Sequence, residues 1–134
     1  MMDIRAKLGM RACAFLFNQG KDVYAPIVHW HEVAKKHKLA TDAATWQQHN
    51  FHMLDLAKSI YFLTCQGWTE SVGLRGEFEF ANQHNISMWL MDITVVGQYN
   101  IYYVAPNYIA EKLYGKDNPQ RGAERANLTV AAKR

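Results

Sequence analysis

The chain has 134 residues, of which 49% are hydrophobic and 20% charged, and this size and composition predict one globular domain spanning residues 1–134. They exclude a disordered tail and a coiled coil. The formal net charge of +3 is mild. We expect no nucleic-acid partner, because nucleic-acid binders usually concentrate far more charge on one face.

No apolar run approaches the roughly 18 to 20 residues that are needed to cross a bilayer. Residues 1–7 also lack the apolar core of a signal peptide. We therefore expect a cytoplasmic protein without a membrane partner. The two cysteines, Cys13 and Cys65, are too few for a disulfide scaffold, and we interpret both as reduced.

The first part of the chain alternates helical and strand patterns. Residues 3–18 carry an apolar stripe at helical spacing and predict a helix. Residues 22–29 predict a strand with a proline near its end, and residues 31–37 predict a short helix. Residues 43–57 predict a further helix, whose apolar stripe is interrupted by the polar Asn50.

A strand, a loop, a helix and a strand follow in the middle of the chain. Residues 59–64 form a continuous apolar run, which is typical of a strand buried on both faces. A glycine-bearing loop covers residues 65–73, a helix residues 74–83 and a strand residues 87–93. This βαβ order implies parallel pairing. We therefore predict an α/β fold, a three-layer sandwich with a mostly parallel sheet of four or five strands, similar to flavodoxin and Rossmann folds.

Residues 93–134 have a less regular pattern, and we interpret them as an atypical C-terminal strand and helix. Residues 100–105 predict a strand, residues 117–122 a loop and residues 123–133 a helix. No low-complexity segment is present in this region.

Three segments match a known pattern in their order and spacing. They are Pro26-Ile27-Val28-His29-Trp30-His31, then Trp46-Gln47, then the stretch from Gly67 to Ala81. In them the chain resembles the nucleoside 2-deoxyribosyltransferase-like superfamily, and within it a phage and bacterial branch of uncharacterised domains similar to nucleoside-monophosphate N-glycosidases. The resemblance covers roughly residues 4–93, and Gly-Trp-x-x-Ser-x-Gly-x-x-x-Glu is its specific part.

The resemblance implies cleavage or transfer at the bond between a base and 2-deoxyribose. By motif position the nucleophilic glutamate is Glu77, which would hold a covalent glycosyl intermediate as retaining glycosidases do. Ser71 stands where nucleotide-cleaving relatives carry a serine, and with the backbone at Gly73 it would bind a 5′-phosphate. The alternatives are a solvated helix carboxylate for Glu77 and a helix N-cap for Ser71.

The sequence departs from the family at the residue that handles the base. The family usually carries an aspartate there, whereas this chain has Asn50, and an amide cannot serve as a general acid. His49 or His52 could replace it. If neither does, the protein would bind a nucleotide or a nucleotide-derived signal with little or no turnover.

A second departure concerns the first strand of the family, because residues 3–18 correspond to the helix that follows that strand. Residues 102–108 resemble the lost strand and turn, and residues 125–134 echo residues 5–14. The chain is on this interpretation circularly permuted, with its C-terminal strand in the centre of the sheet. The rival interpretation is an antiparallel edge hairpin that turns at Gly97.

The remaining candidate residues would complete the pocket. By the resemblance, His29 lines it, Trp68 forms part of its wall, and Tyr108 contacts it if the chain is permuted. The histidines fit no specific zinc spacing, so we expect substrate-side or structural roles and no metal.

The leading hypothesis is a hydrolase that cleaves the N-glycosidic bond of a (deoxy)nucleoside 5′-monophosphate. Glu77 would attack C1′, Ser71 and Gly73 would hold the phosphate, and Asn50 with His49 would address the base. No cofactor is expected. The resemblance also implies a homodimer or a larger homo-oligomer. A binding protein without turnover and a purely structural domain are the alternatives.

Overall fold

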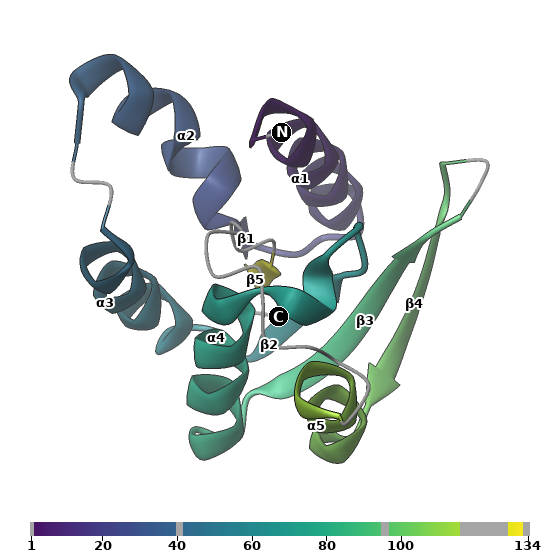
Figure 1. Cartoon of the computed structure of the whole chain (residues 1–134). Coiled ribbons are helices and arrows are strands. Elements are labelled where there is room, and N and C mark those ends of the chain that lie inside the picture. The colour runs from purple at the N-terminus through teal and green to yellow at the C-terminus, as the bar shows by residue number, and fades with distance from the viewer. Residues whose placement is uncertain (1, 40–41, 95–96, 116–128, 133–134) are drawn as a thin grey trace.

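A computed structural model describes residues 2–39, 42–94, 97–115 and 129–132, and every structural statement below concerns these residues. Helices and strands alternate along most of the chain (Figure 1). In order, the elements are α1 (Met2–Asn18), β1 (Val23–Tyr24), α2 (Pro26–His37), α3 (Ala43–Leu54), β2 (Ser59–Leu63), the 3-10 helix η1 (Trp68–Glu70), α4 (Val72–Gln83), β3 (Ser87–Ile93), β4 (Tyr99–Val104), α5 (Pro106–Tyr114) and β5 (Thr129–Ala132). None of the described helices is long and apolar enough to cross a membrane.

The sheet is mixed and has the strand order β1-β5-β2-β3-β4. The crossover from β2 through α4 to β3 gives the parallel pair that the sequence predicts, with Ser59 opposite Ser87 and Leu63 opposite Met91. Every other pair of neighbouring strands is antiparallel. The prediction of a mostly parallel, flavodoxin- or Rossmann-like sheet is therefore wrong, because the strands outside this crossover do not return across the sheet.

The strand β4 forms a hairpin with β3 and lies at the edge of the sheet. Gly97 has a φ of +79° and its amide donates to the Thr94 carbonyl, while the Thr94 amide donates to the Gln98 carbonyl. A glycine takes this left-handed conformation at little cost, and such a short turn can join only antiparallel strands. The edge hairpin is confirmed, and the permutation that placed residues 102–108 in the centre of the sheet is wrong.

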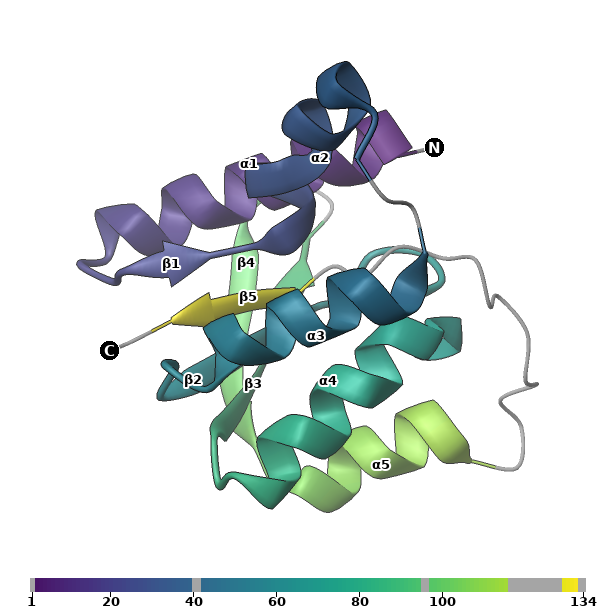
Figure 2. The same cartoon turned by 90° about the vertical axis from the view of Figure 1, so that its left-hand side faces the viewer.

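The strand β5 lies between β1 and β2 and is antiparallel to both (Figure 2). The prediction of a helix over residues 123–133 is thus wrong for residues 129–132, and its other residues lie outside the described part of the chain. Thr129 and Val130 are β-branched, which suits an extended strand better than a helix. The short segment has too few residues for its period to be read from the sequence.

The strand predicted over residues 22–29 is cut short in the structure. Only Val23 and Tyr24 pair in the sheet, and Pro26 opens helix α2. Proline suits the first turn of a helix, because its fixed φ is helical and its missing N–H would have no partner there. The proline therefore marks a helix start and not the end of a long strand.

Two hydrophobic cores lie on opposite faces of the sheet. On β2, Ile60 and Phe62 join the core beneath α4 and α5, whereas Tyr61 and Leu63 join the core beneath α1. This alternation follows from the period of two in a strand. Figure 2 shows α1 and α2 on one side, and α3, α4 and α5 on the other.

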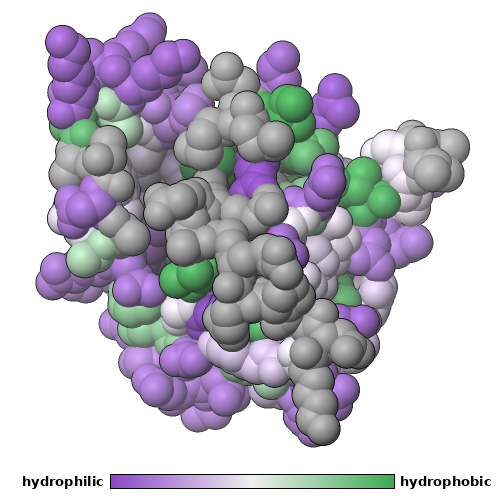
Figure 3. Space-filling model, viewed as in Figure 1, coloured by the Kyte–Doolittle hydropathy of each residue, from purple (hydrophilic) through white to green (hydrophobic). Residues whose placement is uncertain are grey.

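Hydrophilic side chains gather at the outer end of α2 (Figure 3). Lys35, Lys36 and His37 occupy its last turn, where positive charge opposes the negative end of the helix dipole. The basic run is therefore the solvated C-terminal end of a helix.

Candidate functional site

Glu77 lies in the middle of α4 and its side chain is only 1% exposed. Leu74, Phe78 and Ala81 of the same helix pack into the core over the sheet. These apolar contacts fix the helix and thereby hold Glu77 inside the molecule. Carboxylates are rarely buried to this degree, so the position is a candidate site and not a solvated helix face.

Helix α3 approaches α4 closely at Gly76, the neighbour of Glu77. A Cβ atom added at Gly76 would collide with Nε2 of Gln47, so the Gln47 side chain occupies the space that a larger residue would need. Asn50 follows Gln47 by three residues and therefore shares its face of α3. The close approach places Asn50 on the side of α3 that packs against α4.

Two buried polar atoms of α3 have no hydrogen-bond partner among the described residues. They are Oδ1 of Asn50, whose side chain is 5% exposed, and Nε2 of His49. A buried polar atom without a partner costs on the order of 1–3 kcal/mol, so such atoms are uncommon in folded proteins. The two atoms therefore make α3 the part of the candidate site with unused hydrogen-bonding capacity.

Tyr24 is a member of this site to which no sequence pattern points. Its hydroxyl is buried and has no partner among the described residues. Burial raises the pKa of Tyr24, and the negative charge of Glu77 raises it further. The nearby Trp30 side chain lowers the pKa, although it is not positioned to form a hydrogen bond with the Tyr24 hydroxyl. The strand β1 thus brings Tyr24 within electrostatic range of Glu77.

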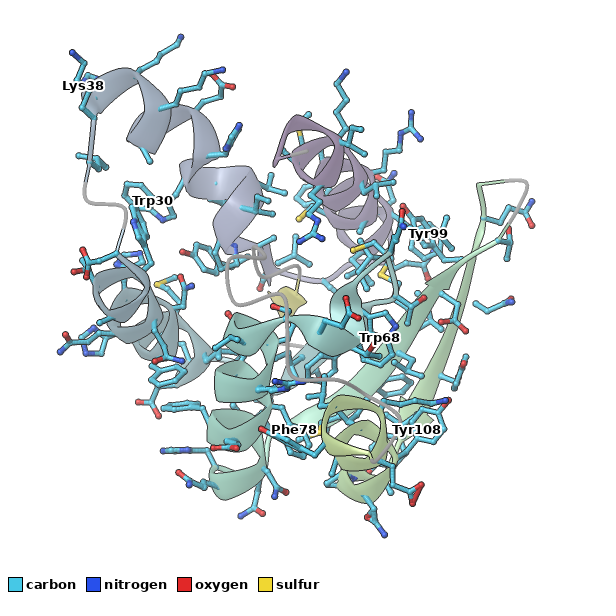
Figure 4. The ribbon with its side chains drawn as sticks, viewed as in Figure 1. Trp30, Lys38, Trp68, Phe78, Tyr99 and Tyr108 are labelled. Atoms are coloured by element: carbon cyan, nitrogen blue, oxygen red, sulfur yellow. The ribbon has the colours of Figure 1, made fainter. Side chains whose placement is uncertain are left out.

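Three rings from α2 and α3 form an aromatic wall beside these groups. The centroids of Trp30 and Trp46 are 5.8 Å apart, and His49 lies 5.2 Å from Trp30 and 5.9 Å from Trp46. Figure 4 shows Trp30 on the α2–α3 side of α4. Because Trp30 is near both Tyr24 and His49, it joins the β1 part of the site to the α3 part.

The start of α4 supplies the groups that we expected to bind phosphate. The Ser71 Oγ atom accepts a hydrogen bond from the Leu74 amide at 3.2 Å, so Ser71 is the N-cap of the helix. Its hydroxyl can still donate to an anion. Gly73 precedes Glu77 by four residues and lies on the same face of α4, so these positions form one line along the helix.

His29 is near the site but is held by its own helix. Its Nδ1 atom lies 3.1 Å from the backbone nitrogen and 2.8 Å from the carbonyl oxygen of Ala25. The ring is exposed and stacks on Tyr24, with centroids 4.9 Å apart and an angle of 29°. His29 thus positions Tyr24 and supports the start of α2.

Trp68 and Tyr108 belong to the part of the molecule around α5. Trp68 packs against the core that α4 and α5 share. Tyr108 lies on α5, with Nζ of Lys112 5.4 Å from its ring centroid, and Figure 4 shows it on the side of α4 opposite to Trp30. The role of Tyr108 depended on the permuted sheet, which the edge position of β4 excludes.

The described residues contain no group of three or more histidines, cysteines or acidic residues that could hold a metal ion. The two cysteines are buried in the core beneath α1. Burial raises the pKa of the Cys13 thiol to about 11 and that of the Cys65 thiol in the same direction. Both thiols therefore stay protonated at neutral pH and are poor nucleophiles.

Comparison with known proteins gives one family. The model of a domain of unknown function, DUF1937, matches residues 1–93. That span contains Tyr24, Trp30, His49, Asn50 and Glu77. No curated protein and no solved structure matches the chain. Since the matched span is more than half of the 134 residues, the chain belongs to the DUF1937 family.

Proposed function

We propose that the protein is a hydrolase that cleaves the N-glycosidic bond of a (deoxy)nucleoside 5′-monophosphate, with Glu77 as the nucleophile. The observation that carries this proposal is the buried carboxylate of Glu77 on a helix that packs against α3, where Asn50 and His49 bury polar atoms without partners among the described residues. A carboxylate can act as the nucleophile toward a sugar carbon, as it does in retaining glycosidases.

The reaction has two steps. A carboxylate oxygen of Glu77 attacks C1′, the bond from C1′ to the base nitrogen breaks, and its electron pair leaves with the base, which takes up a proton. Water then hydrolyses the glycosyl ester, which releases the sugar phosphate and restores the carboxylate. His49 can carry the proton, and the Tyr24 hydroxyl, whose pKa is raised, can donate a hydrogen bond to the sugar or the carboxylate.

The phosphate preference rests on the start of α4. The positive end of the helix dipole and the Ser71 hydroxyl favour an anion there. An axial rise of 1.5 Å per residue separates Ser71 from Glu77 by roughly 9 Å along the helix axis, so one ligand would have to extend along α4 to reach both residues. A nucleoside without phosphate would leave this end of the site empty.

Chromatographic detection of free base tests the proposal. Wild-type protein is incubated with a panel of ribo- and deoxynucleoside 5′-monophosphates and the matching nucleosides, beside Glu77→Ala. We expect base release from at least one monophosphate, less from its nucleoside, and none with Glu77→Ala. Release that persists in Glu77→Ala, or no release from any compound, would contradict the hydrolase.

A binding protein without turnover is the second candidate, and Asn50 is the observation that favours it. Its amide can bind a base edge but cannot protonate a leaving group. A nucleotide that binds only the folded state would raise the melting temperature without losing its base. Asn50→Leu should then reduce this shift, and an unchanged shift would contradict a role for Asn50 in binding.

A further inference from the structure

The outer edge of β4 has no partner strand among the described residues. Tyr99–Val104 pair with Ile93–Met88 in an unbroken register of six residue pairs, without a bulge. Figure 1 shows β4 as the last strand on its side of the sheet, with no described element along its outer edge.

The hairpin geometry determines which backbone groups of β4 point outward. The Thr94 amide donates to the Gln98 carbonyl, so this pair is hydrogen-bonded, and hydrogen-bonded pairs alternate along an antiparallel ladder. Asn100, Tyr102 and Val104 therefore bond to β3. The N–H and C=O groups of the alternate residues, Tyr99, Ile101 and Tyr103, point away from the sheet.

The side chains of β4 do nothing to block a further strand. The strand contains no charged residue and no proline, which are the usual means of protecting an edge. Tyr102 and Tyr103 are 41% and 61% exposed. An exposed, uncharged and regular edge strand is a template for the backbone of another strand.

We propose that β4 pairs with the β4 strand of a second copy of this chain, in an antiparallel arrangement with a two-fold axis at Ile101. This register sets Ile101 opposite the partner's Ile101 and Tyr99 opposite the partner's Tyr103. All three outward positions then match, and each hydrogen-bonded pair exchanges two bonds. The inference is independent of the proposed hydrolase.

The charge pattern favours a second copy as the partner. A strand that pairs with itself across a two-fold axis sets residues near the axis opposite their own copies, so a central charge would repel itself. From Tyr99 to Val104 there is no charge to do so. The pairing also sets tyrosines opposite each other across the interface, a favourable cross-strand contact. One strand pair buries little surface, so the dimer depends on protein concentration.

Disulfide trapping tests the register directly. In a hydrogen-bonded pair the two Cα atoms lie about 5.5 Å apart, within the range for a disulfide. Ile101→Cys should therefore form a covalent dimer under mild oxidation. The control Asn100→Cys lies opposite the partner's Tyr102 and about 7–8 Å from its own copy, so it should cross-link much less. Equal cross-linking of the two variants, or none with Ile101→Cys, would overturn the register.

Sedimentation velocity over a concentration series tests the dimer itself. Wild type and Ile101→Val should show a monomer–dimer equilibrium. Ile101→Pro removes an outward N–H, together with a side chain that packs against the core beneath α1, and should be monomeric. If Ile101→Pro fails to fold, Tyr103→Lys serves in its place, because its side chain is exposed and lysine protects edges. A wild type that stays monomeric, or folded variants that associate as wild type does, would overturn the proposal.

Discussion

The two sides of helix α4 differ in whether their buried polar groups have hydrogen-bond partners. On the α5 side, the Arg75 side chain is 7% exposed, and it donates from Nε to the Leu113 carbonyl at 3.1 Å and from Nη2 to the Thr69 carbonyl at 3.4 Å. On the α3 side, Asn50 and His49 each bury a polar atom that has no partner among the described residues. One side uses its polar groups for structure, and the other keeps them available.

The stability costs explain why this difference points to function. A buried hydrogen bond to a charged group contributes about 1.5–3 kcal/mol, whereas an unsatisfied buried polar atom costs about 1–3 kcal/mol. Arg75 also packs over the ring of Tyr114, 5.5 Å from its centroid. The α5 side therefore stabilises the fold. On the α3 side, the unpaired polar atoms lower the stability of the fold, which is typical of positions that bind or react with a ligand.

The largest expected effect separates two glutamates of the same helix. Glu77→Gln should lower the rate of base release by about 10³-fold or more, because it removes the nucleophile while keeping the side-chain volume. Glu79→Gln should leave it nearly unchanged, because Glu79 is exposed and bonds to the Tyr114 hydroxyl. Initial rates at saturating nucleotide measure both. Equal losses of rate in the two variants would contradict a specific role for the buried Glu77.

A smaller effect concerns stability on the α5 side. Arg75→Met should lower the free energy of unfolding by about 2 kcal/mol, because the carbonyls of Leu113 and Thr69 lose a charged donor. Urea denaturation followed by circular dichroism measures the change. A variant as stable as wild type would show that these hydrogen bonds do not hold α5 in place.

Two tyrosine variants should change stability in opposite directions. Tyr114→Phe removes a hydroxyl that donates to Glu79 at 2.6 Å and should cost roughly 0.5–1 kcal/mol at this exposed position. Tyr24→Phe removes a buried hydroxyl without a described partner and should leave stability equal or raise it by up to about 1 kcal/mol. Under the proposed function it should also slow base release. A destabilised Tyr24→Phe variant would show that the Tyr24 hydroxyl has a partner in the folded protein and is not available to a ligand.

The smallest effect is a pH dependence at the sheet edge, where the polar groups are paired. A hydrogen bond to the Asp92 carboxylate raises the pKa of Tyr102 to about 12, above the value of about 10 in the unfolded chain. Below pH 10 both states keep the proton and the contribution to stability is complete. Between pH 10 and 12 the unfolded state loses its proton first, so stability falls. Tyr102→Phe should show a shallower alkaline decline in thermal unfolding, and an equally steep decline would contradict this pairing.

Local patterns account for the elements that were predicted correctly. The continuous apolar run over residues 59–64 predicted β2, Ser59–Leu63, because a strand buried on both faces needs no alternation, and the strand predicted over residues 87–93 has the bounds of β3. Ser71, weighed as an N-cap, starts α4 as expected. The strand β4 and its turn at Gly97 were also predicted, whereas β5 depends on long-range pairing with β1 and β2, which no local pattern specifies.

Some residues of the candidate site could likewise be predicted from the sequence, and others could not. The motif around Glu77 and the polar Asn50 on an apolar stripe were visible in the sequence, and both proved to be buried. Tyr24 could not be found, because its proximity to Glu77 depends on how β1 sits against α4. Trp30 lay inside a recognised segment, but its contacts with Trp46 and His49 depend on the packing of α2 against α3.

Trapping the glycosyl intermediate on Glu77 is the most direct test of the central claim. The protein is mixed with a 2′-fluoro analogue of a nucleotide that it cleaves, because the electron-withdrawing fluorine slows hydrolysis of the ester, and it is then quenched in acid and digested. The account predicts a sugar-phosphate mass on the peptide that contains Glu77 and none in Glu77→Gln. Base release with no adduct, or an adduct on a different residue, would contradict it.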